Sequence, residues 1–314
     1  MKEWKTRWES RKGRMLHESI LASIEQNTPL TQIPGLPFIE NKIDLRGITI
    51  PPRPYRVINY TLENVDLSYA VLPGTIWEKC VFTNVILHSA SLDAIEFWAC
   101  RFDNTRFDKT DLNEALMNGT LSNDSGYFKD VDFVGANLNG TMYGNTQFER
   151  VNFVNCKLRK VDFNGSRFKD CSFTGKLDEV FFRGNELINL KMFPGRITHP
   201  NKMENVNFSS AILDSVAFLD GLDISHCIFA QSDDYVIIRR NRNRVFEEAR
   251  KVVQGWSGKH QKIGLALIDQ YYLSARTKNN TGEVVDIHYL RKTDREFGVQ
   301  FFTLIKKINT EING

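Results

Sequence analysis

The feature that most limits the fold of this 314-residue chain is a large apolar residue at every fifth position. An α-helix repeats its buried face every 3.6 residues and a β-strand every 2, so neither produces a period of five. From residue 62 to 117 the five-residue step meets only large apolar side chains: Leu62, Leu67, Leu72, Trp77, Phe82, Leu87, Leu92, Phe97, Phe102, Phe107, Leu112 and Met117. Between Leu121 and Gly126 the phase slips, and we expect one extra residue to bulge there. The step then resumes: Phe128, Phe133, Leu138, Tyr143, Phe148, Phe153, Leu158, Phe163, Phe168 and Phe173.

A second pattern lies two residues before each large one, where most side chains are small or β-branched. All five cysteines occupy this position: Cys80, Cys100, Cys156, Cys171 and Cys227. Their odd number and irregular spacing match no metal site or disulfide framework. A free cysteine behaves as a small buried hydrophobe. We therefore predict five reduced, inward-pointing cysteines and a cytoplasmic, reducing location.

The triplets Val65-Asp66-Leu67, Ala136-Asn137-Leu138 and Val161-Asp162-Phe163 resemble the repeating unit of the pentapeptide-repeat family. The resemblance covers roughly residues 43–230. It implies a mainly β fold, a right-handed quadrilateral β-helix in which each pentad forms one side of a square and four pentads form a turn. Residues twenty apart would then stack. At the usual strand spacing of about 4.8 Å, about eight turns would make a rod roughly 40 Å long.

The remaining segments lack the period of five. Residues 1–42 predict an N-terminal helical cap followed by a Pro-rich segment, and residues 231–314 predict a helical C-terminal module. In the C-terminal segment, apolar residues recur at the helical spacing i, i+1, i+4, i+7, i+8 and i+11: Val245, Phe246, Ala249, Val252, Val253 and Trp256. Solenoid ends expose apolar surface, so both segments are well placed to cap the coil.

One break in the coil is long enough to be a loop. The stretch FPGRITHPNKMEN offers no matching apolar residue before Val206, and it contains the turn formers Pro194-Gly195 and His199-Pro200. We predict a loop over 193–204. Loops on rigid scaffolds often carry recognition, although a tolerated insertion is an equal alternative. Its candidate partner-binding residues are Phe193, Arg196, His199 and Lys202.

A second candidate contact is an arginine cluster at a predicted helix start: Arg239, Arg240, Arg242 and Arg244. Arginines and the free N–H groups of a helix start both favour an anion. The alternative is a solvated helix face, or arginines paired with acids of the coil. The basic N-terminal segment, which contains Trp4 and Trp8, suits a capping helix or a helix lying on a membrane surface.

Motifs for chemistry are absent from the sequence. It contains no G-x-x-x-x-G-K-[ST], no H-E-x-x-H and no G-x-S-x-G. The histidines show no ligand spacing, and we predict a non-enzyme with no catalytic residue, cofactor or metal site. A net charge of +3 does not indicate direct nucleic-acid binding, and no apolar run is long enough to predict a membrane span.

These observations favour a bacterial, non-enzymatic solenoid that binds a protein partner. The family resemblance implies an alternative, protection of bacterial type II topoisomerase (gyrase) from drugs or toxins by imitation of DNA. Duplex DNA carries about one charge per 1.7 Å, whereas residues 43–230 have a net charge of −4, so that alternative needs acids gathered on one face. A second alternative is a ligand-binding or enzymatic C-terminal module. A homodimer through the terminal modules is left open.

Overall fold

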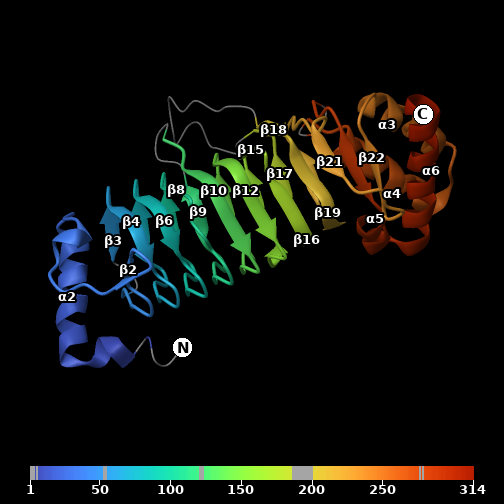
Figure 1. Cartoon of the computed structure of the whole chain (residues 1–314). Helices are drawn as coiled ribbons and strands as arrows, with labels where there is room; N and C mark the ends of the chain where they lie inside the picture. The colour runs from blue at the N-terminus through green and yellow to red at the C-terminus, as the bar shows by residue number, and fades with distance from the viewer. Residues whose placement is uncertain are drawn as a thin grey trace.

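A computed structural model of the chain describes residue 4 and residues 6–51, 55–119, 124–185, 201–275, 277 and 279–314. It is a rod, with a helix at the N-terminal end, a coil of about eight turns, and a C-terminal group of helices at the far end (Figure 1). The predicted right-handed quadrilateral β-helix is confirmed.

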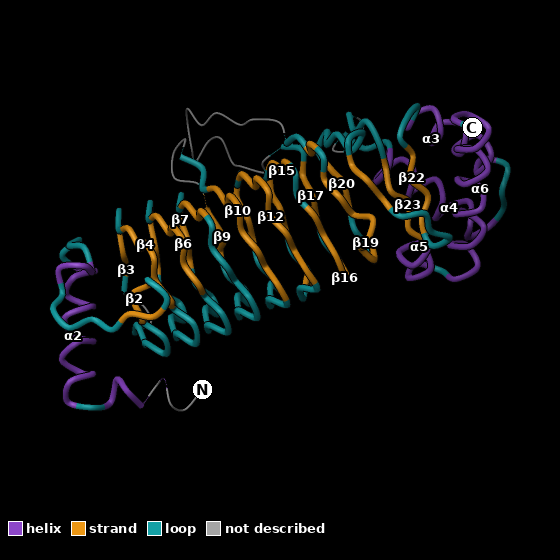
Figure 2. The backbone as a smooth tube through the Cα atoms, viewed as in Figure 1, coloured by secondary structure: helices purple, strands orange, loops and turns teal. Residues whose placement is uncertain are grey.

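The sides of the coil form two sheets, drawn in orange in Figure 2. The larger contains β1 (Phe38–Ile39), β2 (Lys42–Asp44), β4 (Thr61–Asp66), β6 (Val81–Ile86), β8 (Arg101–Asp103), β10 (Tyr127–Val134), β12 (Gln147–Val154), β13 (Leu158–Arg159), β15 (Arg167–Lys169), β16 (Ser172–Asp178), β18 (Met203–Glu204), β19 (Val206–Asp214) and β21 (Cys227–Phe229). The smaller contains β3 (Arg56–Ile58), β5 (Ile76–Glu78), β7 (Glu96–Trp98), β9 (Leu116–Gly119), β11 (Met142–Gly144), β14 (Asp162–Asn164), β17 (Phe181–Arg183) and β20 (Ala217–Leu219). Apart from the antiparallel pair β1–β2, these strands pair in parallel from one turn to the next.

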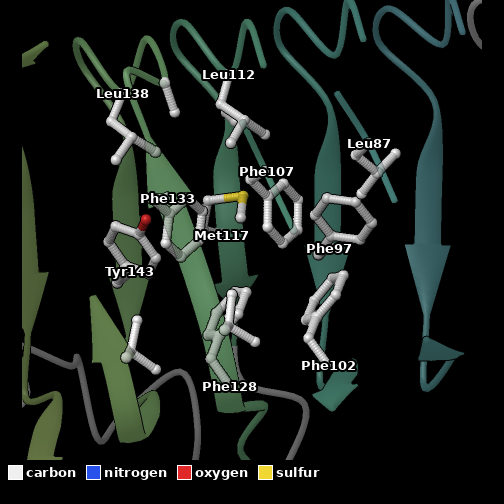
Figure 3. Packing of buried hydrophobic residues seen from close by; sticks show 14 of the residues in the cluster. Leu87, Phe97, Phe102, Phe107, Leu112, Met117, Phe128, Phe133, Leu138 and Tyr143 are labelled. Atoms are coloured by element: carbon white, nitrogen blue, oxygen red, sulfur yellow. The ribbon is translucent and has the colours of Figure 1, made fainter. Parts of the chain in front are cut away.

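The large residues fill the interior in stacked columns, as the period of five predicts. The ring of Phe82 lies 4.7 Å from that of Phe102, and Phe102 lies 4.6 Å from Phe128, with the ring planes 13° and 4° apart. Figure 3 shows several of these columns side by side. Aromatic pairs of this kind add to the free energy gained by burial alone.

The five cysteines are free and buried, which confirms their predicted inward position. Four of their thiols donate to the carbonyl of the large residue 23 positions earlier: Cys80 to Val57, Cys100 to Trp77, Cys156 to Phe133 and Cys171 to Phe148. The hydroxyl of Thr110 does the same to Leu87 at 2.6 Å. The small position therefore accepts a hydrogen-bond donor because a carbonyl one turn away receives it.

The N-terminal cap consists of η1 (Arg7–Glu9), α2 (Arg11–Glu25) and η2 (Leu30–Gln32). Ser10 caps α2 by accepting a hydrogen bond from the Gly13 amide at 3.0 Å. The guanidinium of Arg7 lies 2.7 Å from the Asp44 carboxylate on the first turn. Ile20 and Ile24 are buried in the same apolar cluster as that turn, so the helix closes this end of the coil.

The C-terminal module is mixed rather than purely helical. Its helices are α3 (Arg242–Gln254), α4 (Gly258–Leu267), the π-helical η3 (Ile268–Tyr272), α5 (Ile287–Thr293) and α6 (Arg295–Asn313). The module also contains an antiparallel pair of strands that the sequence pattern did not predict, β22 (Tyr235–Ile238) and β23 (Glu283–Asp286). The two strands are only four residues long and some 45 residues apart in the chain, so no local period reveals their pairing.

Side chains of this module form hydrogen bonds with backbone groups of the last turn, which a further turn of the coil would otherwise satisfy. The Asn280 side chain accepts from the Gly221 amide at 2.7 Å and donates to the Phe218 carbonyl at 2.6 Å. Arg239 donates to the Cys227 carbonyl at 3.0 Å. Buried backbone groups need such partners, so the module caps the coil through hydrogen bonds as well as through apolar contact.

The first break in the coil is longer than predicted. Phe102 pairs with Phe128, a separation of 26 residues, whereas Phe82 pairs with Phe102 at a separation of 20. The turn therefore holds six extra residues, not the single bulged residue that the phase slip indicated. An insertion of six residues shifts the phase of the five-residue period by one position, as an insertion of one residue does. The period alone therefore cannot distinguish the two insertions.

The second break ends earlier than predicted. Met203 is buried and pairs with Phe168, so the coil resumes at β18 and residues 203 and 204 are not part of a loop over 193–204. Asn201 stands two residues before Met203, and it is buried with its side-chain amide donating to the Arg183 carbonyl at 3.0 Å. Asparagine is not typical of the small position, which is why the sequence pattern did not reveal this pentad.

Candidate functional site

The two breaks in the coil occur at the same edge of the rod. The first lies between β9 and β10, and the second between β17 and β18. In each case the preceding strand belongs to the smaller sheet and the following strand to the larger. In solenoid proteins, insertions that map to one face often mark the binding face.

A groove of about 660 Å³ lies on the face of the coil that begins at this edge. It crosses β10, β12, β15 and β18, which are neighbours in Figure 1. We call it the Tyr127 groove, and its lining residues are Tyr127, Phe128, Lys129, Gln147, Phe148, Glu149, Arg167, Phe168, Lys169, Lys202 and Glu204. It spans the turns between the two breaks.

The stacking of the turns arranges these side chains in two columns. One column contains Tyr127, Gln147, Arg167 and Lys202. The other contains Lys129, Glu149, Lys169 and Glu204. Strands in a sheet lie about 4.8 Å apart, so the second column alternates cation and anion at roughly that spacing. The groove therefore presents a repeating charge pattern together with one aromatic ring.

Cations in this groove are in excess over free acids. Lys129, Arg167, Lys169 and Lys202 form no ion pair with any residue that the structure describes. The Nε atom of Arg167 is buried and has no hydrogen-bond partner there. Glu149 is occupied, because Arg150 binds both Glu149 and Asp130. Glu204 is then the one lining acid without an ion pair to a described residue. The hydrogen bond from Arg150 lowers the pKa of Asp130, which keeps that carboxylate charged and paired.

The residues predicted from the loop lie mostly outside the described part of the chain. Phe193, Arg196 and His199 fall within residues 186–200, which the structure does not describe. Lys202 is described, and it is exposed in the Tyr127 groove.

The predicted arginine cluster does not form one surface. Arg242 is buried, with its guanidinium 2.6 Å from Glu283, and it also donates to the Tyr272 carbonyl at 2.7 Å. Arg239 binds the end of the coil. Arg240 and Arg244 are exposed. The start of α3 therefore turns Arg242 into the interior, and the four side chains are not gathered for a single anion.

A smaller pocket of about 270 Å³ lies between the coil and the C-terminal module. Its apolar wall includes Phe181, Tyr271 and Tyr289, and burial raises the pKa of Tyr271 above its ordinary value. Its carboxylate Asp286 already accepts from the amides of Ser215 and His288, both at 2.7 Å. No cluster of three or more metal-binding side chains occurs within the described ranges. No helix among those residues is long and apolar enough to cross a bilayer.

The groove residues Tyr127, Lys129, Arg167 and Lys169 were not predicted. They occupy the outward positions on either side of each large residue, so the pentad pattern shows that they face solvent. Their alignment depends on which turns are adjacent. Lys202 joins the column of Arg167 only because the turn between Phe168 and Met203 is 35 residues long.

Comparison with known proteins agrees with this geometry. The family model described as pentapeptide repeats matches residues 62–98 and 144–175, with eight copies. No curated protein sequence matches the chain. Among solved structures, a trypsin-treated variant of QnrB1, a plasmid-mediated fluoroquinolone resistance protein, is 18% identical and has a TM-score of 0.39, over 61% of this chain and 84% of QnrB1.

Two cyanobacterial structures are also similar. HetL, a pentapeptide-repeat protein involved in heterocyst differentiation regulation in Nostoc sp. strain PCC 7120, is 14% identical with a TM-score of 0.35, over 65% of this chain and 95% of HetL. Rfr23, a pentapeptide-repeat protein from Cyanothece 51142, is 14% identical with a TM-score of 0.27, over 41% of this chain and 89% of Rfr23. With eight matched repeats and a coil whose sides are single pentads, the chain carries pentapeptide repeats folded as a β-helix.

Proposed function

We propose that this protein is a non-enzymatic, cytoplasmic rod that binds a protein partner through the Tyr127 groove. The observation that carries the proposal is the position of the groove, which lies between two breaks in the coil at one edge and holds four cations without an acidic partner among the described residues. Aromatic and arginine side chains supply many binding hot spots, and Tyr127 and Arg167 line the groove together. A partner surface with a modest excess of acids complements it.

The alternating column favours a protein over a nucleic acid as the partner. Glu204, which forms no ion pair with a described residue, would repel a uniform polyanion, whereas a protein surface can match cations and anions in turn. Such electrostatic complementarity between two surfaces adds specificity and speeds their association.

The charge pattern gives little support to imitation of DNA, the basis of the gyrase alternative. A duplex mimic needs a dense row of free acids. Several acids of this coil are instead paired with cations: Asp44 with Arg7 and Arg46, Asp130 with Arg150, Asp162 and Asp220 with Arg183, and Asp214 with Lys176. A gyrase supercoiling assay with and without a fluoroquinolone tests this alternative directly.

The proposal is tested by reversing charge in the groove. The double variant Arg167→Glu with Lys202→Glu changes two outward side chains of one column. The matched control, Lys157→Glu with Lys160→Glu, makes the same change in net charge at two exposed lysines on the opposite side of the coil. Partners are captured from host lysate on wild-type protein and identified by mass spectrometry, and affinities are then measured with the purified partner.

We expect the groove variant to lose at least about tenfold in affinity, which corresponds to about 1.4 kcal/mol, while the control binds like wild type. Melting temperatures of all three proteins show whether the coil is intact. Equal binding by the groove variant would exclude the groove as the contact. Equal loss in both variants would indicate a response to net charge instead of a specific site.

A further inference from the structure

One face of the coil is built from a repeated two-bond clamp. On this face one outward residue of each turn makes two backbone hydrogen bonds to the preceding turn. Its N–H donates to the carbonyl of the small residue there, and its carbonyl accepts from the amide of the large residue. Ser91, for example, donates to the Ala70 carbonyl at 2.8 Å and accepts from the Leu72 amide at 2.9 Å. The same clamp holds Val71, Asp111, Asn137 and Lys157.

At the last turn this clamp is empty. The corresponding small and large residues are Ala211 and Leu213 on β19, but β21 pairs only with residues 206–208 of that strand. The carbonyl of Ala211 and the amide of Leu213 have no hydrogen-bond partner among the described residues. The next amide with the same direction, that of Ser215, donates to the Asp286 carboxylate at 2.7 Å. The C-terminal module thus provides a hydrogen-bond partner for the Ser215 amide but none for the Ala211 carbonyl and the Leu213 amide.

The chain turns away where it would have filled this position. Phe208 pairs with Phe229, so one further pentad of coil would place Asp233 opposite Ile212. Instead the Asp233 side chain is 98% exposed and pairs with Lys306 at 3.0 Å. A groove of about 270 Å³ remains beside the open edge, with Ala211, Ile212, Leu213, Tyr235 and His288 among its lining residues.

The central residue of the open edge, Ile212, carries no protecting charge. Exposed strand edges commonly carry lysine or other charged side chains that prevent pairing with another chain. The column that ends at this edge contains Lys157 and Lys176 in the two preceding turns, but Ile212 in the last turn. The Ile212 side chain is 64% exposed. The position between the two open backbone groups therefore carries a β-branched apolar residue, while the charged residues that line the groove, Lys176, Asp214 and Asp234, flank it.

We propose that the free edge of β19 at Ala211–Leu213 accepts an extended peptide segment of a partner protein as an additional parallel strand. Addition of a strand to a sheet edge is an established mode of peptide recognition, in which backbone hydrogen bonds give affinity and side chains give specificity. One peptide residue fills the clamp, donating to Ala211 and accepting from Leu213. Its side chain lies next to Ile212, which selects an apolar or β-branched residue. This site is independent of the Tyr127 groove.

The probe for this site is a fluorescent six-residue peptide, SSAILD, with the sequence of residues 209–214 of β19, which the chain itself stacks in parallel register. It omits the first three residues of β19 because residues 206–208 already pair with β21. Its isoleucine would occupy the clamp. We expect the peptide to bind, and we expect N-methylation of that isoleucine to weaken binding at least about tenfold. N-methylation of the following leucine is the matched control, because its amide points away from β19 and its loss leaves the clamp intact.

Amide hydrogen exchange reports on the edge directly. Leu177 occupies the position of Leu213 one turn earlier and is paired on both sides, by β13 and by β19. We expect the Leu213 amide to exchange faster than the Leu177 amide in the free protein, and to slow at least about tenfold when the peptide saturates. Equal protection of the two amides in the free protein, or no change at saturation, would overturn the proposal.

A pair of variants completes the test. Ile212→Lys restores the residue type of Lys176 in the same column, so the fold should tolerate it, and peptide affinity should fall at least about tenfold. Ile228→Lys changes another exposed isoleucine, on β21, and should bind like wild type. Wild-type affinity in Ile212→Lys, or equal losses in both variants, would contradict a site at Ala211–Leu213.

Discussion

The guanidinium of Arg242 lies 2.6 Å from the Oε2 atom of Glu283 inside the C-terminal module, and the two side chains are only 1% and 3% exposed. The pair joins the first turn of α3 to β23. Arg242 also lies over the ring of Phe246, with its Cζ atom 5.1 Å from the ring centroid. An arginine from a basic, polar stretch of sequence thus serves as a core residue.

Loss of Arg242 should be costly. Removal of one partner leaves a buried charge without its counter-ion, so Arg242→Ala should lower the free energy of unfolding by about 3–5 kcal/mol in urea denaturation. Arg244→Ala, two residues along the same helix and exposed, should change it by less than about 0.5 kcal/mol. Replacement of the pair by Arg242→Met with Glu283→Leu should recover much of the loss. Similar stabilities for the two alanine variants would show that the ion pair is unimportant.

Phe148 tests the stacked core. It is buried between Phe128 at 5.3 Å and Phe168 at 4.7 Å. Phe148→Ala should cost about 3–5 kcal/mol, because the substitution loses the transfer free energy of the ring and leaves a cavity. Phe38→Ala, at an exposed ring on β1, is the control and should have little effect. An unchanged urea midpoint for Phe148→Ala would show that the register of the coil is wrong.

The cysteines should resist modification in the folded protein. Burial raises the pKa of Cys156, Cys171 and Cys227 to about 12, so the reactive thiolate is scarce at neutral pH. We expect no rapid labelling by a thiol reagent at pH 8 in native buffer, and five labelled thiols in denaturant, counted by mass spectrometry. Rapid native labelling of any cysteine would contradict its inward position.

Asp44 should make the N-terminal cap sensitive to acid. Burial opposes its ionisation, but hydrogen bonds from Arg46 and Arg7 outweigh burial and hold its pKa well below the ordinary value. A depressed pKa in the folded state gives stability that is present above the unfolded pKa of about 3.9 and is lost as pH falls below it. Asp44→Asn should therefore cost about 1.5–3 kcal/mol at pH 7, the usual range for a charged hydrogen bond.

The difference in free energy of unfolding between wild type and Asp44→Asn should shrink as pH falls from about 5 toward 2. Urea denaturation at each pH measures this difference. Asp124→Asn is the control, since among the described residues that exposed carboxylate has only a distant ion pair, with Lys79 at 3.6 Å. A difference that stays constant across this pH range would show that the ionised carboxylate contributes nothing to the cap.

Much of this fold follows from side-chain spacing alone. The period of five specifies which residues face inward, and it identified the Phe148 column and the position of Cys171 without reference to distant parts of the chain. Which residues of a pentad face inward depends only on their positions in that pentad, because each pentad forms one straight side of the coil. The same reasoning identified the ends as caps, since a repeat that stops leaves apolar surface.

Register across the breaks was decided only by the tertiary structure. A phase shift reports chain length only up to a multiple of five, so the sequence pattern could not show that Phe128 stacks on Phe102 after six extra residues or that Met203 returns to the column of Phe168. The Tyr127 groove and the empty clamp at Leu213 both depend on that register. Likewise, Arg242 and Arg244 look alike in a basic stretch of sequence. Only the packing of α3 against β23 and η3 buries one and exposes the other, because burial of a charge requires a partner that lies far away in the chain.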